Sequence, residues 1–308
     1  MIEFDYDSLD ALAAVVREGT FEAAARELNV TQSAVSQRIK QLEERLGAIL
    51  VVRGRPCVPT EFGLQLCRHI DHVLLLEHEL KRSIAGKASG MGSEAALLRI
   101  AVNSDSLSTW FPNVIRRAAS ELNVNLDIMT DDQEHSADRL KSGEAMAALT
   151  ANDTPIQGFR RLSLGAMEYL GVATPEFCAR YFADGVTLTA LQAAPSIAFD
   201  RKDQLLTQWL MEKFGEAHPL HGHLVPSYEG YVACCANGTG WGVVPIDAAR
   251  SMLRTGKLVD LAPDTRVRIG LHWQSSAKGS EVLRVLANIV TEEARRALIA
   301  PPKQSTAT

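Results

Sequence analysis

The apolar residues near the N-terminus recur at helical spacing in three runs, which are separated by turn residues. The first run has an apolar side chain every three or four positions from Leu9, and this period predicts a helix that ends at Gly19. Thr20 then stands as an N-cap before an alanine-rich run over 21–28. Because alanine has a small side chain, this second helix is suited to close packing against a neighbour.

The third run has its apolar positions on one face and its uncharged polar residues in the first turns. Thr31 is placed to cap this helix, and Gly47 is placed to end it. With Val35 and Ile39 directed to a core, the polar residues of the first turns must point outward. The second and third helices are joined by a tight turn at 29–30, which is the plan of a helix-turn-helix.

The outward residues of this third helix are of the kind that read DNA. The first turns of a recognition helix enter the major groove, where Gln pairs with adenine and Ser reaches several base edges. The candidates for base reading and the cap beside them are Thr31, Gln32, Ser33, Ser36 and Gln37. The candidates for phosphate contacts are Arg38, Lys40, Arg53 and Arg55. The alternative is an ordinary amphipathic helix with a solvated polar face.

Short apolar pieces on both sides of R-G-R-P at 53–56 predict a two-stranded wing, so we assign 1–60 to a winged helix-turn-helix domain. Thr60 then caps a long helix, and residues 61–92 are expected to form a dimerisation helix followed by a hinge of small residues. Its seam has the spacing of helices that pair, and comprises Leu66, Ile70, Val73, Glu77, Leu80 and Ile84. The alternative is a helix packed on its own domain.

Beyond the hinge, the pattern changes to alternating strands and helices, which predicts a mostly parallel α/β sheet. The expected strands lie at 97–102, 126–129, 145–149, 169–173, 196–199, 242–245 and 271–273. A last helix is expected over 281–298, and the tail at 303–308 is expected to be disordered.

Length and composition limit the class of protein. The 308 residues fit two or three domains, because single cores seldom grow beyond about 250 residues. No apolar run is long enough to span a bilayer, so we expect no membrane partner. The acidic N-terminus M-I-E-F-D-Y-D lacks the features of a secretory signal, which predicts a cytoplasmic location. Five cysteines without a C-x-x-C pair argue against a disulfide framework and a structural zinc site.

The charge distribution separates the N-terminal region from the rest. A net charge of −5 argues against a protein that coats nucleic acid indiscriminately. Residues 31–60 nevertheless carry five basic and two acidic side chains. Clustered cations gain free energy by releasing counterions from DNA, so the pattern indicates phosphate contact that is limited to one site.

Motifs for catalysis or metal binding are incomplete. G-T-G-W-G at 238–242 lacks the last glycine of a dinucleotide-binding fingerprint. H-G-H at 221–223 has no further ligand at metal spacing, so we interpret it as a surface loop. The sequence has neither a G-x-S-x-G elbow nor a motif of paired catalytic carboxylates. We therefore expect no enzyme, no metal and no cofactor.

Several stretches resemble one family. T-F-E-A-A-A-R-E-L-N-V-T-Q-S-A-V-S-Q-R-I-K-Q-L-E-E-R-L-G, followed by V-V-R and P-T-E-F-G, resembles the DNA-binding half of LysR-type transcriptional regulators. A-V-N-S-D-S-L-S-T-W-F, D-D-Q-E-H-S and G-T-G-W-G-V-V-P resemble the arginine- and lysine-responsive ArgP/LysG branch. The resemblance covers about residues 5 to 300.

The resemblance implies a winged helix-turn-helix, a dimerising linker helix and an effector domain over 93–302 that is similar to periplasmic binding proteins. Its first lobe would comprise about 97–165 and 273–300, and its second lobe about 166–272. The implied partners are promoter DNA with dyad half-sites, a second copy in a homodimer that forms a homotetramer, and RNA polymerase. The implied effector is L-lysine or L-arginine, and the implied target is a gene for export of basic amino acids.

In such a two-lobed domain, the ligand lies where strands end and helices begin. The candidates for effector binding at these positions are Ser104, Asp105, Ser106, Asp131, Asp132, Asp200, Tyr228 and Glu229. The backbone N–H groups and hydroxyls at 104–106 would hold an amino acid carboxylate, and the acidic residues would attract a cationic ligand. Alternatively, Asp105 only caps its helix, and Asp131 and Asp132 are solvated turn residues. We expect no more than one of these last two to touch the ligand.

Overall fold

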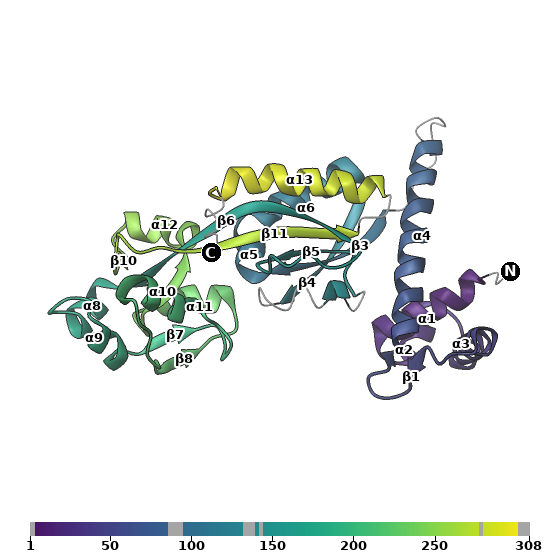
Figure 1. The fold of residues 1–308 in the computed structure, drawn as a ribbon, viewed down its shortest axis with the longest axis horizontal. Helices are drawn as coiled ribbons and strands as arrows, with labels where there is room; N and C mark the ends of the chain where they lie inside the picture. Colours follow the sequence, from purple (N-terminus) through teal and green to yellow (C-terminus); the bar gives the residue numbers. More distant parts are fainter. Residues whose placement is uncertain (1–3, 86–94, 132–138, 142–143, 277–279, 301–308) are drawn as a thin grey trace, which may run out of the picture.

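The structure is a computed structural model that describes residues 4–85, 95–131, 139–141, 144–276 and 280–300. An N-terminal helical domain continues into one long helix, and a separate, elongated α/β domain lies beside that helix (Figure 1). The expected hinge at 86–92, Asp132 and the expected tail fall outside the described residues.

Three short helices form the N-terminal domain, each with a side-chain cap. They are α1 (Tyr6–Glu18), α2 (Phe21–Glu27) and α3 (Gln32–Leu46). Thr20 and Thr31 accept hydrogen bonds from the backbone N–H groups of Ala23 and Ala34, as the sequence predicts. The first helix begins earlier than expected because Asp5 caps it by accepting from the N–H of Asp7. Buried residues of all three helices share one core.

The wing consists of β1 (Val51–Val52) and β2 (Val58–Pro59), which pair antiparallel. The Glu43 carboxylate near the end of α3 accepts the backbone N–H of Leu50 at 2.8 Å. This hydrogen bond joins the start of the wing to α3 and so helps to fix the position of the wing relative to that helix.

The long helix α4 (Glu61–Ala85) begins after Thr60, whose hydroxyl accepts the N–H of Gly63 at 3.2 Å. Only part of the expected pairing seam on α4 is exposed to solvent. Ile70 is 1% exposed in the core of its own domain, whereas Leu80 and Ile84 are 60% and 55% exposed. The prediction of one continuous seam for a partner helix was therefore wrong at its first half, because those residues complete the helix-turn-helix core.

The helix α4 also contacts the α/β domain. Asp71 pairs with Arg99, and the Glu79 carboxylate accepts the Ser280 hydroxyl at 2.7 Å. His72 Nε2 and Ser276 Oγ lie 2.9 Å apart. One face of α4 thus rests on the α/β domain.

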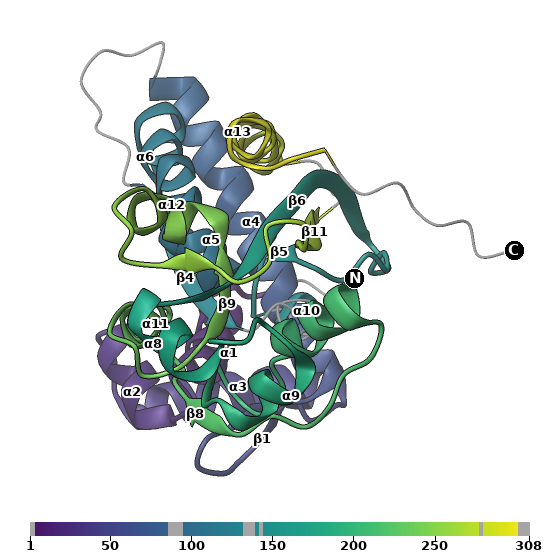
Figure 2. The same cartoon turned by 90° about the vertical axis from the view of Figure 1, so that its left-hand side faces the viewer.

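The first lobe of the α/β domain has a parallel core of three strands. These are β3 (Ala96–Asn103), β4 (Val124–Asp131) and β5 (Ala147–Thr150), with β3 in the middle. The short helix α5 (Ser104–Thr109) follows β3 directly, and α6 (Phe111–Leu122) follows it. The last helix α13 (Glu281–Ala297) packs against α6, and both lie on one side of the sheet (Figure 2).

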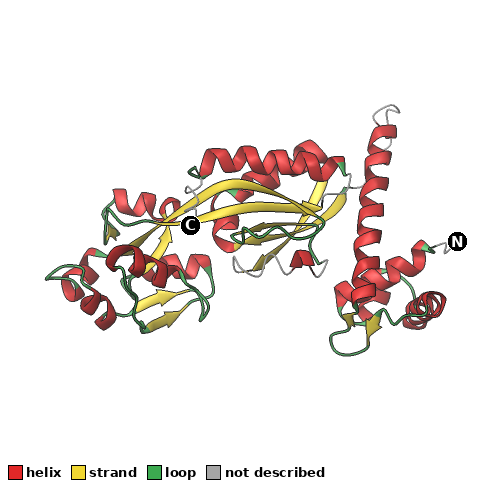
Figure 3. Ribbon diagram, viewed as in Figure 1, coloured by secondary structure: helices red, strands yellow, loops and turns green. Residues whose placement is uncertain are grey.

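Two long antiparallel strands connect the lobes. β6 (Phe159–Ala173) and β11 (Val267–Ser276) pair along most of their length and run from one lobe into the other (Figure 3). The proposed lobe boundaries fall inside these strands, where the register shifts between Leu271 and His272. Gly165 lies opposite with φ of 133°, and its missing side chain leaves room for the backbone of Ile299.

The second lobe adds β9 (Gly242–Pro245) and β10 (Val259–Asp260) antiparallel to β6, and a separate parallel pair of β7 (Ser196–Ala198) with β8 (Gly222–Leu224). Its helices are α8 (Pro175–Tyr181), α9 (Leu188–Ala193), α10 (Leu205–Phe214), α11 (Tyr228–Ala236) and α12 (Ile246–Arg254).

Two predictions about strands need correction. The large sheet is not mostly parallel, because β6 and β11 return across it and pair antiparallel with their neighbours. The H-G-H stretch at 221–223 is not simply a surface loop, because strand β8 begins at Gly222. All of β8 is exposed, so it lacks the apolar alternation by which a strand is recognised.

None of the helices among the described residues has the length and apolar character needed to cross a membrane.

Candidate functional site

The first turns of α3 present the residues that the sequence singled out for DNA. Gln32, Ser33 and Gln37 are exposed, while Val35 and Ile39 are buried beneath them. Ser36 is partly exposed. Thr31 is also exposed, but its hydroxyl accepts the N–H of Ala34 at 3.1 Å and so serves the helix cap. The exposed face of α3 therefore carries uncharged donors and acceptors of the kind that read base edges.

Two of the expected phosphate-contacting residues have acidic partners. The Arg38 guanidinium donates to the Asp7 carboxylate at 2.8 Å, and Lys40 Nζ lies 3.6 Å from a Glu44 carboxylate oxygen. Exposed ion pairs of this kind contribute little to stability. A phosphate that replaces either acid therefore displaces a weak contact.

The wing brings a cation next to the face of α3. The Arg53 guanidinium lies 5.0 Å from the centre of the Phe21 ring and donates to the Ser36 hydroxyl at 3.5 Å. Arg55, two residues on, is exposed. A cation held on an aromatic ring loses less conformational freedom on binding than a free one. Arg53 is thus positioned beside the residues that face outward from α3.

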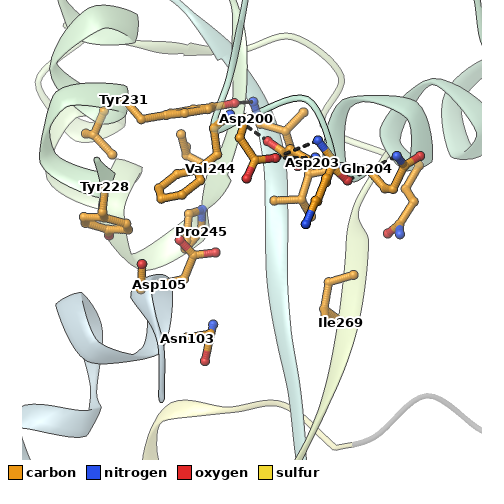
Figure 4. Close-up of a pocket in the computed structure, with 17 residues that line it drawn as sticks. Asn103, Asp105, Asp200, Asp203, Gln204, Tyr228, Tyr231, Val244, Pro245 and Ile269 are labelled. Atoms are coloured by element: carbon orange, nitrogen blue, oxygen red, sulfur yellow. Dashed lines mark hydrogen bonds between the residues drawn. The ribbon is translucent and has the colours of Figure 1, made fainter. Parts of the chain in front are cut away.

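A second site is a cavity of about 140 Å³ that both lobes line (Figure 4). Its polar lining comes from the end of β3 and the start of α5, from α10 and the loop before it, and from α11. It consists of Asn103, Ser104, Asp105, Asp200, Lys202, Asp203, Gln204, Gln208, Tyr228 and Tyr231. Its apolar lining consists of Phe199, Leu205, Val232, Val243, Val244, Pro245 and Ile269. An apolar cavity with a few convergent polar groups is typical of a small-molecule site.

Half of the predicted effector residues line this cavity: Ser104, Asp105, Asp200 and Tyr228. Ser106 is 0% exposed and lies within the packed wall, and Glu229 is exposed to solvent outside the lining residues. Asp131 ends β4, where the register places it beside Asn103, but its side chain lies outside the described part.

The Asp105 carboxyl is the central acidic group of the cavity. Tyr169 of β6 donates its hydroxyl to Asp105 Oδ2 at 2.7 Å. Burial, together with the nearby charge of Asp203, raises the pKa of Asp105 from 3.8 to about 6, although the Tyr169 hydrogen bond acts in the opposite direction. Asp105 is not the N-cap of α5, because that position belongs to Asn103. Its carboxyl instead lines the cavity and accepts the Tyr169 hydroxyl.

The two acids from the second lobe are engaged with their own loop. Asp200 Oδ1 accepts the backbone N–H groups of Lys202 and Asp203 at 2.7 and 3.0 Å. Asp203 accepts those of Phe199 and Leu205, each at 2.9 Å. These bonds fix the loop that faces Asp105 across the cavity (Figure 4), and they place further negative charge in the wall.

The sequence interpretation missed Asn103 and Asp203. Asn103 is the residue immediately before Ser104, and Asp203 follows Asp200 in the sequence D-R-K-D-Q. The signal for both was proximity to a strand end, but the direction of each side chain depends on packing that the sequence does not display. Within the described ranges, no three His, Cys, Asp or Glu side chains lie close enough together to bind a metal ion.

Comparison with known families matches both halves of the chain. Residues 6–64 match the family described as "Bacterial regulatory helix-turn-helix protein, lysR family", and residues 92–295 match the family described as "LysR substrate binding domain". The transcriptional regulator ArgP of Pseudomonas aeruginosa is 41% identical over 299 residues, which cover 97% of this chain and 99% of that protein. The regulator LysG of Mycobacterium bovis is 40% identical over 288 residues, which cover 94% and 93%.

Solved structures give the same correspondence. The crystal structure of ArgP from Mycobacterium tuberculosis is similar with a TM-score of 0.81 and 38% identity, and covers 97% of this chain and all 100% of that one. Full-length LysG from Corynebacterium glutamicum with arginine bound as effector is similar with a TM-score of 0.74 and 33% identity, and covers 96% and 100%.

Proposed function

The chain belongs to the LysR family of transcriptional regulators, and from this premise we propose that its effector is a basic amino acid, L-lysine or L-arginine. Ligand binding in the cavity would change how the protein occupies a promoter. The proposed target is a gene for export of basic amino acids, as the resemblance to the ArgP/LysG branch implies.

The observation that carries this proposal is the set of three carboxyl groups that line the cavity, Asp105, Asp200 and Asp203. A partly desolvated carboxylate is stabilised by a cation within hydrogen-bond distance. Asp200 and Asp203 add two carboxylates from the other lobe, where Lys202 also lines the cavity. An anionic effector would meet repulsion from these carboxylates. The arginine bound to the related LysG supports the assignment by analogy.

In the DNA-binding domain, we propose two different roles for two sets of residues. Gln32, Ser33, Ser36 and Gln37 would read base edges, while Arg38, Lys40, Arg53 and Arg55 would contact phosphates and fix the register. The bound DNA would be a promoter segment with dyad half-sites, because a symmetric oligomer reads repeated sites. RNA polymerase is the proposed downstream partner.

We propose a homodimer through α4, two of which associate into a homotetramer. The support is the exposed apolar part of the helix at Leu76, Leu80 and Ile84, which recur at helical spacing on α4. Exposed apolar stripes of this kind are typical of helices that pair.

A physical route connects the cavity with α4. Strand β3 ends at Asn103 in the cavity wall, and four residues earlier Arg99 pairs with Asp71 of α4. Strand β11 likewise carries Ile269 in the wall and Ser276 beside His72. A ligand that shifts either strand would therefore act on the helix that carries the DNA-binding domain.

The test is thermal unfolding of the full-length protein with L-lysine, L-arginine, L-glutamate or benzoate. A ligand that binds only the folded state stabilises it by about 2.7 kcal/mol at 100 times its Kd. We expect a shift with lysine or arginine and none with the two anions. The matched variant Glu229→Gln removes an acid outside the cavity and should respond like the unchanged protein. Absence of any shift would support an architectural DNA-binding protein, or replication-initiation inhibitor, without effector response.

A further inference from the structure

We propose that the Asn103 carboxamide holds the α-amino and α-carboxylate groups of the bound amino acid. This inference rests on the proposed function and adds the orientation of the ligand. The main-chain end would lie on the wall formed by β3 and α5, and the side chain would extend toward the loop at 200–204 of the other lobe.

The Asn103 side chain is buried and unpaired. It is 1% exposed, and neither Nδ2 nor Oδ1 has a hydrogen-bond partner within the described part of the chain. It nevertheless lines the cavity, and Figure 4 places it beside Asp105 and away from Asp200. A buried amide without partners is unfavourable and uncommon in folded proteins, so a group that satisfies both atoms would gain from entering this cavity.

The Asn103 side chain does not cap the helix that it precedes. Asn103 occupies the N-cap position of α5 with φ of −69° and ψ of 147°, yet its side chain makes no capping bond. Asparagine at an N-cap usually accepts a backbone N–H of the first turn. Here that usual local partner is not used, and the side chain belongs to the cavity lining instead.

The chemistry of the amide selects one end of the ligand. Nδ2 donates and Oδ1 accepts, so full satisfaction requires an acceptor and a donor close together on the ligand. The α-carboxylate and the α-ammonium of an amino acid supply this pair. A guanidinium or a side-chain ammonium carries only donors, and would leave Nδ2 unpaired. The Asp105 carboxylate, which has only acceptors when it is ionised, then faces the α-ammonium, and Asp200 and Asp203 lie toward the cationic side chain of the ligand.

The test compares L-arginine with agmatine, which lacks the α-carboxylate, by calorimetric titration of the full-length protein. Asn103→Leu should weaken L-arginine binding by about 10- to 100-fold, the usual loss for a hydrogen bond to a charged group. Asn103→Asp preserves the shape but opposes the carboxylate, so it should bind agmatine more tightly than L-arginine. Thermal unfolding without ligand checks that both variants fold, and the nearly isosteric Asn103→Asp keeps the test decisive if Asn103→Leu does not.

The matched control is Ser106→Ala. Ser106 lies in the same segment and also has a buried hydroxyl without a partner among the described residues, but it does not line the cavity. This variant should bind L-arginine within about three-fold of the unchanged protein, a difference of less than 1 kcal/mol. Asn103→Leu with the same small change, or Asn103→Asp that still prefers L-arginine to agmatine, would overturn the inference alone. Failure of the unchanged protein to bind either lysine or arginine would overturn the proposed function together with it.

Discussion

The face of α3 and the cavity between the lobes are built in opposite ways. The α3 face comes from one continuous segment, whose caps and periodicity are local properties of the sequence. The cavity joins residues from the junction of β3 and α5, the loop before α10 with α10, and α11, which lie at 103–105, 199–208 and 228–232 in the sequence. Consequently the α3 face carries groups that are exposed to solvent and accessible to DNA. The cavity carries buried groups whose pKa values and hydrogen bonds depend on their neighbours.

The difference is visible in the two sets of charged groups. Two of the cations near α3, Arg38 and Lys40, make weak ion pairs with Asp7 and Glu44 at the surface. Asp105 in the cavity has a pKa raised to about 6 because it is desolvated. We therefore expect substitutions in the cavity to have large effects on a small ligand, and substitutions near α3 to have graded effects on DNA.

The largest expected effect is that of Asp105→Asn. Removing the carboxylate leaves a bound cation without its charged partner, and the loss of such a buried contact is typically 2 to 5 kcal/mol. We expect the affinity for lysine or arginine to fall by about 100-fold in calorimetric titration. The affinity for promoter DNA without effector should not change. An effector affinity within a few-fold of the unchanged protein would show that Asp105 is structural.

The next largest effect distinguishes residues that contact bases from residues that contact phosphates at α3 and the wing. Gln32→Ala should weaken binding to the best operator by about 1–3 kcal/mol and leave binding to unrelated DNA unchanged, because a base contact is lost. Arg53→Ala should weaken binding to both kinds of DNA and lower the slope of log affinity against log salt by about 1. Fluorescence anisotropy at several salt concentrations measures both. If the two variants behave alike, the division between base-reading and phosphate-contacting residues fails.

The same contrast explains how much of the molecule was predictable. Thr20, Thr31 and Gly47 act through their own backbone neighbours, so the three N-terminal helices followed from the sequence. The α4 seam was predicted only in part, because helical spacing defines an apolar face without saying which partner covers it. Ile70 packs on its own domain, while Leu80 remains exposed.

In the cavity, the rule that ligands lie at strand ends predicted Ser104 and Asp105, and the structure places both in the cavity lining, since the rule depends on topology alone. It also predicted Ser106, which is buried, and Glu229, which is exposed, and neither of them lines the cavity. It did not include Asn103, because the last residue of a strand can face either side, and only the packed structure shows that its amide lines the cavity. The long crossing strands β6 and β11 were likewise seen only in fragments.

The smallest expected effect is the pH dependence of effector binding. A cationic effector requires ionised Asp105, and burial raises the pKa of this carboxyl to about 6. Lowering the pH from about 7.5 to about 5.5 should therefore weaken binding by about four-fold, since the ionised fraction falls accordingly. DNA binding by the guanidinium groups at 38, 53 and 55 should not follow this titration, because arginine remains charged throughout.

The stability of the empty protein should change in the opposite direction. The folded-state pKa of Asp105 lies above its ordinary value of 3.8, so this group contributes stability that is fully present below about pH 4 and is lost as the pH rises through about 6. The contribution of this residue is obtained by subtracting the unfolding curves of Asp105→Asn, which lacks the titration, from those of the unchanged protein. If acidification lowers both the contribution of Asp105 to the free energy of unfolding and the affinity for the effector, the Asp105 carboxyl is not desolvated. If it strengthens the first and weakens the second, the cavity is held ready for a cation at a cost to its own stability.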